Sequence, residues 1–294
     1  MKLNKPKLVV NPFILLFISI LAVAISSILI KSSNTPPSVA GMYRLYITVL
    51  ILLPFVSWKK LNFTQLTKKD WSIIFLAGFF LGLHFLFWME SLSYTSVASS
   101  MVILTLQPLF VMIGSYFIFK ERVSKLKALC MVTAVFGSLI IAWGDIGVSR
   151  GAIIGDVLSL LGTISISVYM LAGQKVSQNI SANVYSIIVF FLGGSVMLIY
   201  SLVNNFNLTD YRSSDWIYFF VLAVIPTIFG HLIFNLLLKS MGATTVSVGV
   251  IGEPVLAIIL AFFLLGEAVT SSQITGGLFT IVSMGVYFYL KSNK

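Results

Sequence analysis

Charged residues are scarce in this chain of 294 residues, and acidic residues are the scarcest. Only 10% of the residues are charged, and only nine are Asp or Glu, whereas a water-soluble domain carries about 25% charged residues. Hydrophobic residues make up 58% of the chain, and the mean hydropathy is +1.02. A soluble monomer must present a polar surface, and this composition cannot supply one. The scarcity of charge therefore excludes a water-soluble fold and indicates a protein that is surrounded by lipid.

The chain also has little of what metal sites, disulfides and hydrolytic centres require. It contains two histidines and a single cysteine, Cys130, which lies in an apolar run. One cysteine forms no intramolecular disulfide, and Cys130 is expected to be a small buried hydrophobe. The sequence holds no His/Glu metal cluster, no nucleophile elbow and no phosphate-binding loop. We therefore expect no metal, no cofactor and no enzymatic activity, and an integral membrane enzyme is the weakest alternative.

What the chain has instead is long apolar stretches, each near the roughly 20 residues that a membrane-spanning helix needs. The first is too long for the apolar core of a secretory signal, so it is expected to be a span. The connections are short, and none is large enough to fold as a separate domain. The sequence thus predicts an all-α integral membrane protein with ten spans near these bounds: Phe13–Ile30, Ser38–Trp58, Trp71–Leu92, Val97–Phe119, Leu126–Trp143, Ala152–Ala172, Val184–Asn204, Trp216–Leu238, Ala243–Leu265 and Ile274–Leu290.

Lys and Arg are distributed unevenly over the connections. Of the 19 in the chain, fifteen fall on the side of the two termini, three (Lys31, Arg150 and Arg212) fall on the other side, and Arg44 lies within the second stretch. The positive-inside rule places the richer side in the cytoplasm. A multi-pass protein of the cell membrane with both termini cytoplasmic is therefore expected, which agrees with an even number of spans. The net charge of +10 is interpreted as this topology signal rather than as a nucleic-acid footprint.

The second half of the chain repeats features of the first at a shift of 146 residues. Gln107-Pro108 falls on Glu253-Pro254, and Val123-Ser124 falls on Val269-Thr270. The repeat predicts two units, 1–146 and 147–294, with five helices each. Because five is odd, the second unit enters the membrane from the opposite side, which is the inverted-topology repeat of many secondary transporters.

Several residues also resemble a known family pattern, that of EamA-type proteins in the drug/metabolite transporter superfamily. The residues that carry the resemblance are Pro254, Leu265-Gly266-Glu267, Gln273, Gly276, Gly155-Asp156 and Arg44. The resemblance covers nearly the whole chain as two EamA repeats. It implies a ten-helix transporter of small metabolites with a central cavity lined mainly by the first, third, fourth, sixth, eighth and ninth helices. The first half departs from the pattern, since Lys120 replaces a glycine before Glu121 and Cys130 stands in the place of Gly276.

Few ionisable groups lie at membrane depth, where a charge costs at least about 2.5–3.5 kcal/mol, so each is a candidate functional residue. Glu253 is the sharpest candidate, because it lies about 15 Å into its helix and precedes Pro254, which frees backbone carbonyls in the preceding turn. Burial favours the protonated form of a carboxyl group, so Glu253 is expected to bind an ammonium group or exchange a proton. The alternative is a structural Glu at a kink. Gln107, its repeat counterpart, is expected to form an interhelical hydrogen bond or line the cavity.

Two further polar faces are predicted from the helical spacing of four residues. His231 shares a face with Thr227 and Asn235, and it forms a proton-responsive pair with Glu253 if the eighth and ninth helices pack as a hairpin. His84 and Trp88 share a face of the third helix, where a cation–π contact and simple packing are both open.

Arg44 lies near the outer end of the second helix. It either snorkels to the interface, pairs with an acidic residue or binds a substrate carboxylate. Together with Lys31 it would form a rim that attracts anions. Glu121 and Glu267 are expected to be structural groups at helix ends, and Asp156 is expected to be an N-cap.

The function that these patterns favour is secondary transport, with export as the expected direction. The expected cargo is a small polar metabolite such as an amino acid, carried by alternating access and coupled to protons. A facilitative channel or uniporter is the alternative, although no filter motif or pore-lining charged ring is evident. The expected partners are the substrate, protons and the lipid bilayer, and nucleic acid is not an expected partner. A monomer and a homodimer are both left open.

Overall fold

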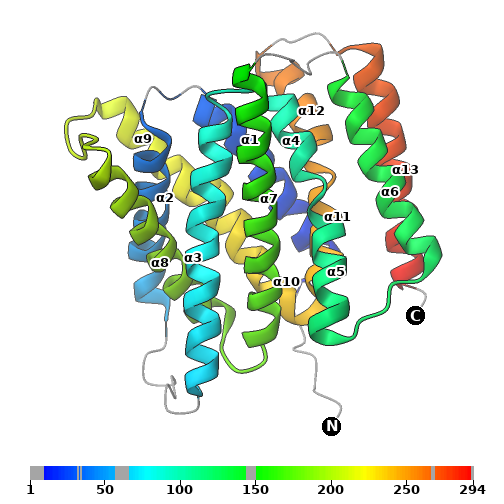
Figure 1. The fold of residues 1–294 in the computed structure, drawn as a ribbon, viewed down its shortest axis with the longest axis horizontal. Helices are drawn as coiled ribbons and strands as arrows, with labels where there is room; N and C mark the ends of the chain where they lie inside the picture. The colour runs from blue at the N-terminus through cyan, green and yellow to red at the C-terminus, as the bar shows by residue number, and fades with distance from the viewer. Residues whose placement is uncertain are drawn as a thin grey trace.

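A computed structural model describes residues 10–31, 33, 35–56, 66–143, 150–265 and 269–292. These residues fold into helices joined by short turns (Figure 1). In chain order the helices are α1 (Pro12–Lys31), α2 (Pro37–Leu52), η1 (Leu53–Phe55), α3 (Lys68–Ser91), α4 (Val97–Leu104), α5 (Gln107–Phe119), α6 (Lys125–Ala142), α7 (Arg150–Val176), α8 (Ala182–Val203), α9 (Ser213–Leu222), η4 (Ala223–Leu232), α10 (Ile233–Met241), α11 (Ala243–Val250), α12 (Glu253–Leu265) and α13 (Ser271–Ser292).

Ten segments of the described chain are long and apolar enough to cross a membrane. They coincide with the ten predicted stretches, and the all-α fold class with ten spans is confirmed. Seven spans are essentially single helices, while three are interrupted: α4 with α5, α9 with η4 and α10, and α11 with α12. The interruptions are the part of the fold that matters most for the site.

Two interruptions fall at the residue pairs that the repeat singles out. α4 ends at Leu104 and α5 begins at Gln107, which is followed by Pro108. α11 ends at Val250 and α12 begins at Glu253, which is followed by Pro254. Proline cannot donate to the preceding turn, so the helix starts afresh there with the proline in its first turn. Gln107 and Glu253 therefore both lie at the N-terminus of a half-helix inside the bundle.

The third interruption is a π-helical segment, η4, with Pro226 inside it. Pro226 lacks the backbone N–H that would bind the carbonyl of Leu222. The hydroxyl of Thr227 donates to that carbonyl at 2.7 Å, and Thr48 donates to the carbonyl of Ala223 at 3.1 Å. The side chains replace the missing backbone bond, and π-helical turns of this kind are frequent at functional sites.

The closest helix packing occurs between the first five spans and the last five. α3 packs on α7 and α8, α2 on α8, α1 on η4, α5 on α11, and α6 on α13. Figure 1 shows α6 and α13 running side by side at one edge of the bundle. Gly137 and Gly276 meet at their crossing, where a Cβ on Gly137 would lie 2.7 Å from the carbonyl oxygen of Gly276. The two backbones touch, so neither position has room for a side chain.

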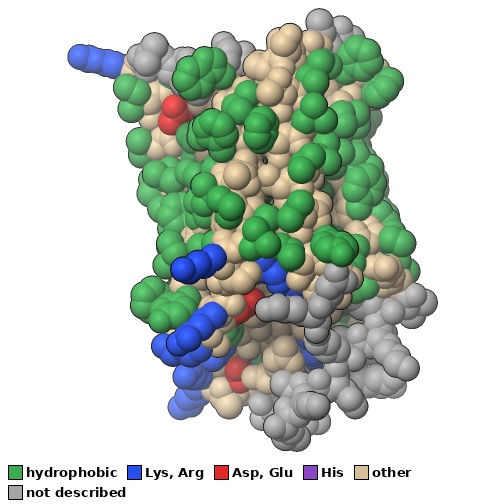
Figure 2. All heavy atoms as spheres, turned by 90° about the vertical axis from the view of Figure 1, so that its right-hand side faces the viewer, with side chains coloured by type: hydrophobic (Ala, Val, Ile, Leu, Met, Phe, Trp, Pro, Cys, Tyr) green, Lys and Arg blue, Asp and Glu red, His purple; other side chains and the backbone are tan. Residues whose placement is uncertain are grey.

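One end of the bundle, called here the basic end, carries most of the described Lys side chains: Lys68, Lys69, Lys120, Lys125, Lys127, Lys175, Lys239 and Lys291. In Figure 1 it is the lower end, where α3, α6 and α8 begin and α7 and α13 end. Figure 2 shows Lys and Arg gathered toward that end, below a broad band of apolar side chains. Aromatic residues such as Phe117 (67% exposed) and Phe263 (76% exposed) are outward-facing, as lipid contact requires.

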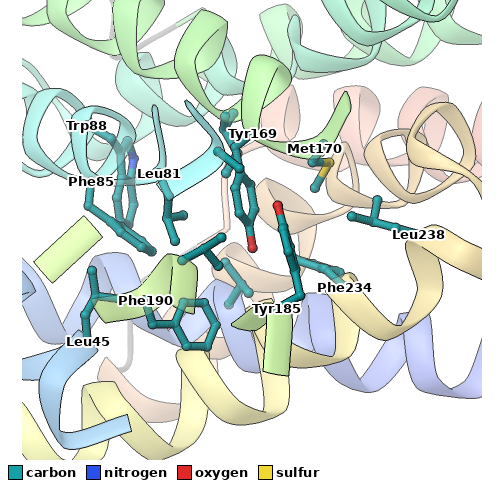
Figure 3. Packing of buried hydrophobic residues seen from close by; sticks show 14 of the residues in the cluster. Leu45, Leu81, Phe85, Trp88, Tyr169, Met170, Tyr185, Phe190, Phe234 and Leu238 are labelled. Atoms are coloured by element: carbon teal, nitrogen blue, oxygen red, sulfur yellow. The ribbon is translucent and has the colours of Figure 1, made fainter. Parts of the chain in front are cut away.

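The interior is packed with aromatic and aliphatic side chains from both halves. Figure 3 shows Phe85 and Trp88 of α3 beside each other, with Leu81 between them and Tyr169 of α7, whose neighbour in the view is Tyr185 of α8. The Tyr169 and Tyr185 rings are stacked at 6.3 Å between centroids. This close packing surrounds the buried polar groups.

Candidate functional site

Six of the seven residues predicted to form a site line one small cavity in the middle of the bundle: Arg44, His84, Trp88, Gln107, His231 and Glu253. The rest of the lining is Val23, Ser26, Leu104, Ile166, Met170, Phe234 and Val250. These residues come from the first, third, fourth, sixth, eighth and ninth spans, as the family resemblance implies, and Arg44 of the second span reaches in among them. The cavity has a volume of about 30 Å³, which is room for one or two water molecules.

Arg44 is the largest fully buried side chain of the described residues, with an exposed fraction of 0%. Its Nε donates to Thr227 Oγ1 at 2.6 Å, and its Nη1 donates to Ser26 Oγ at 3.1 Å. Its guanidinium carbon lies 4.3 Å from the centre of the Phe85 ring, a cation–π contact. The snorkelling alternative is therefore wrong, because the side chain turns inward, where hydroxyl groups and an aromatic face replace water. The side chain of Lys31, the other member of the predicted rim, lies outside the described residues.

Glu253 is 4% exposed and stands at the first position of α12. Helix N-termini stabilise negative charge, and Arg44 lines the same cavity as Glu253. The carboxylate oxygen Oε1 has no hydrogen-bond partner, however. Gln107, its counterpart on α5, donates from Nε2 to the sulfur of Met170 at 3.0 Å. Gln107 thus makes the expected interhelical hydrogen bond and also lines the cavity.

The two histidines lie close together and form an aromatic cluster. Their ring centres are 6.4 Å apart, and the ring of His84 is parallel to that of Trp88. His84 Nδ1 lies 3.0 Å from the carbonyl oxygen of Gly162, so this nitrogen carries the proton and donates it. His231 packs edge-on against Phe85, and its Nδ1 has no partner. No described hydrogen bond joins His231 to Glu253, so the expected proton-responsive pair is present only as two residues in one cavity.

Asn235 is the predicted site residue that lies outside the cavity lining. It accepts a hydrogen bond from Tyr169 at 2.6 Å and donates to Ser186 at 2.9 Å. Both partners are buried, and the three groups link α7, α8 and α10 toward the basic end. Gln174 closes this end further by accepting a hydrogen bond from the backbone N–H of Ala243.

Asp156 has a different role from the predicted one. α7 begins six residues earlier, at Arg150, so Asp156 is not an N-cap. Instead its Oδ1 accepts hydrogen bonds from Thr95 at 2.9 Å and from Ser99 at 2.8 Å. These contacts tie the α3–α4 turn to α7 at the end opposite the basic end. Along α7, the cavity residues lie between this contact and the one made by Gln174.

A second, much wider pocket of about 510 Å³ opens near the end opposite the basic end. It is lined by Ile30, Ser33, Thr35, Pro36, Pro37, Ala40, Met89, Glu90, Leu92, Ser93 and Phe206. Its residues lie one helical turn from those of the small cavity, since Ile30 follows Ser26 on α1 and Ala40 precedes Arg44 on α2. Glu90 is half-buried in this pocket, close to the solvated position that the sequence predicts.

Sequence reasoning missed Ser26 and Met170, which complete the site. A serine and a methionine in apolar helices carry no signal of their own, and only the neighbouring Arg44 and Gln107 give them a role. Of the two glutamates expected at helix ends, Glu121 does follow α5, while Glu267 lies outside the described residues.

Half-helices that place polar groups inside a bundle of membrane-length helices are a recurrent feature of solute carriers. The chain belongs to the EamA-like transporter family, whose sequence profile matches residues 11–143 and again residues 153–289. It is thus a multi-pass membrane protein of a transporter family, and this membership points to transport rather than to catalysis.

Several relatives of the chain are named as transporters. A protein of Clostridium kluyveri named an uncharacterized transporter is 24% identical over 84% of this chain and 81% of its own length. The uncharacterized transporter YdfC of Bacillus subtilis is 25% identical over 88% and 83% of the two chains. A WAT1-related protein of Arabidopsis thaliana is 23% identical over 96% and 88%. A protein crystal structure matches with a TM-score of 0.80 at 14% identity, covering 95% of this chain and 96% of that one, which shows the fold alone.

Proposed function

We propose that the protein is a secondary transporter that exports small polar metabolites such as amino acids, by alternating access coupled to protons. The observation that carries the proposal is the convergence of Arg44, His84, Gln107, His231 and Glu253 on one cavity in the middle of the bundle. Ionisable groups at this depth are costly to bury, so a binding role for them is the default explanation. The protein would reside in the cell membrane with the basic end, and both termini, in the cytoplasm.

The division into two inverted repeats, 1–146 and 147–294, is part of the proposal. It is supported by the pattern of helix packing, which is nearly unchanged when the first five spans are exchanged for the last five. Three pairs of equivalent spans pack on each other: the second on the seventh, the fourth on the ninth and the fifth on the tenth. In addition, the third span packs on the sixth, and the equivalent contact is made by the eighth span on the first. Halves related in this way rock against each other about a central site.

Opening would break a small number of hydrogen bonds at one end at a time. The Asp156 contacts to Thr95 and Ser99 would part when the site opens toward the wide pocket. The Tyr169–Asn235 and Gln174–Ala243 contacts would part when it opens toward the basic end. Each such bond contributes only about 0.5–1.5 kcal/mol net, so either end can open without unfolding the bundle.

Glu253 is the proposed coupling residue, because it is the described acidic residue in the central cavity. It would carry either a proton or a substrate ammonium group, but not both. This mutual exclusion would couple proton transport to substrate transport. Arg44, His84 and His231 are the other charged or titratable groups that face it. A gradient of one pH unit is worth about 1.4 kcal/mol per proton, which is about tenfold accumulation for exchange of one proton per solute.

The test is substrate-screened uptake into proteoliposomes with and without an imposed pH gradient, for the wild type and Glu253→Gln. Glu90→Gln is the matched control, since it removes a carboxylate from the wide pocket only. The expected result is that Glu253→Gln keeps solute exchange and loses gradient-driven accumulation, while Glu90→Gln keeps both. Equal accumulation by Glu253→Gln and the wild type would make Glu253 a structural residue. Flux that does not saturate would favour a channel instead.

A further inference from the structure

The edge of the bundle that α6 and α13 form carries a concentration of positive charge far from the central cavity. Most of the described Lys and Arg side chains at the basic end belong to this edge rather than to the rest of the bundle. They lie in the α5–α6 turn, the first turn of α6 and the last turn of α13, and are called here the edge cluster: Lys120, Arg122, Lys125, Lys127 and Lys291. Glu121 is the acidic residue of the same turn, so the edge cluster keeps a clear positive excess.

The tight pairing of α6 with α13 brings these charges together. Besides the contact of their glycines, the hydroxyl of Ser283 on α13 donates to that of Thr133 on α6 at 3.0 Å. The two helices run in opposite directions, so α6 begins where α13 ends (Figure 1). Nζ of Lys127 lies 5.9 Å from the centre of the Tyr287 ring on α13, and Lys291 follows Tyr287 by one helical turn. Basic side chains from both helices therefore gather at one place.

An exposed apolar stripe on each helix leads away from the edge cluster. The side chains of a stripe recur every three or four residues, which places them on one face of their helix. The stripes are Leu126, Leu129, Val132 and Phe136 on α6, and Tyr289, Val286, Val282 and Leu278 on α13. Figure 2 shows this edge of the bundle, with apolar side chains over most of its height and Lys and Arg toward its lower end. A basic end below a membrane-length apolar surface matches the two parts of a phospholipid, its phosphate and its acyl chains.

Two partners fit an apolar edge in a membrane, a lipid and a second copy of the chain. A symmetric dimer uses the same surface on both subunits, so two copies that met through this edge would bring their edge clusters side by side. Like charges at an interface cost free energy. The phosphate of an anionic lipid supplies the opposite charge instead, so the charge of the edge favours lipid over a second copy.

We propose that the α6–α13 edge is a binding site for an anionic phospholipid, whose phosphate contacts Arg122, Lys125 and Lys291 and whose acyl chains lie along the two apolar stripes. Arg and Lys are the side chains that bind phosphate groups in proteins. The bound lipid contacts both α6, the last of the first five spans, and α13, the last of the second five. The site is separate from the central cavity and does not depend on the proposed transport function.

The test measures binding of single lipids to the full chain in detergent by native mass spectrometry. The probes are dioleoyl phosphatidylglycerol, which is anionic, and dioleoyl phosphatidylcholine, which has the same acyl chains and a zwitterionic headgroup. The wild type should bind the first phosphatidylglycerol at least about tenfold more tightly than the first phosphatidylcholine, because each nearby Lys or Arg favours the anionic headgroup. This comparison needs no substitution, so it is independent of any folding defect.

Two triple variants then locate the site. The edge variant carries Arg122→Gln, Lys125→Gln and Lys291→Gln. The control variant carries Lys68→Gln, Lys69→Gln and Lys239→Gln. Each variant loses three positive charges from two exposed side chains and one half-buried side chain at the basic end. The edge variant should reduce the preference for phosphatidylglycerol to within about threefold, whereas the control variant should keep the preference of the wild type.

A phosphatidylglycerol with a photoreactive acyl chain gives the position of the lipid, and its cross-links should fall on α6 and α13. Equal binding of the two lipids by the wild type would overturn the proposal, and so would cross-links confined to other helices. An equal loss of preference in both variants would assign the effect to the charge of the whole basic end and not to this edge. A dimer that dissociates only in the edge variant would make the edge an interface between copies of the chain instead.

Discussion

The electrostatic coupling between Arg44 and Glu253 is the most direct measurable consequence of the cavity. The perturbation is a double-mutant cycle with Glu253→Gln, Arg44→Gln and both together. The two side chains are buried in the same cavity, but the free atoms Nη2 and Oε1 lie beyond hydrogen-bond contact. For unit charges roughly 4–8 Å apart, Coulomb's law with an effective dielectric constant of about 20 gives about 2–4 kcal/mol.

The single substitutions should each leave one buried charge without its counter-charge, and the double substitution should remove both charges. We therefore expect the double variant to be less destabilised than the sum of the single variants by about 2–4 kcal/mol. Thr227 loses little when Arg44 is replaced, because its hydroxyl still donates to the carbonyl of Leu222. The cost of losing the other arginine contacts is common to both backgrounds and cancels in the cycle.

The assay is equilibrium unfolding in detergent micelles at two pH values, one on each side of the titration of Glu253. The coupling should be present where Glu253 is ionised and should vanish as the pH falls and the carboxyl group becomes neutral. Additive effects within about 0.5 kcal/mol at both pH values would show that the charges do not act on each other. The cavity would then hold no coupled pair of charges.

Three further outcomes are expected elsewhere in the bundle. Gly276→Ala should lower the free energy of unfolding by about 1–3 kcal/mol, because the added Cβ would meet the backbone of α6. Gly285→Ala is the control, since its Cβ would meet nothing within 4 Å and should leave the stability unchanged. Equal effects of the two substitutions in chemical denaturation would contradict the α6–α13 crossing. Tyr169→Phe should cost about 1–3 kcal/mol in the same assay, since the buried oxygen of Asn235 loses its donor, and an unchanged stability would mean that water replaces the hydroxyl. Asp156→Ala should speed hydrogen exchange of the 95–100 backbone, which it holds through two side chains, and unchanged exchange would remove Asp156 from the closure of that end.

The bounds of the spans could be predicted from the sequence because lipid imposes a one-dimensional constraint. An apolar stretch of about 20 residues must be a helix, since only a helix satisfies its own backbone in hydrocarbon. The same reasoning identified Glu253, Gln107 and the two histidines as interior residues, because a polar group within the hydrocarbon layer must face the protein interior. Family membership, too, was visible in the residues alone, and the sequence profile confirmed it.

The partners of the polar groups could not be predicted, because they depend on which helices meet and at what height. Arg44 lies one or two turns from a helix end, where the local sequence permits both snorkelling and burial. The π-helical turn at Pro226 places Thr227 against Arg44. The sequence of the second span does not predict that contact. Asp156 shows the same limit, because the hydroxyls of Thr95 and Ser99 reach it from another helix.

The sequence by itself thus determined the solvent, the number of spans and the residues that must avoid lipid. Only the tertiary structure decided that Asn235 lies outside the cavity while Arg44 turns into it. Hydrophobic burial acts on each segment separately, whereas hydrogen bonds and charge pairs need two segments at one place, and that place is fixed by the packing of all ten spans.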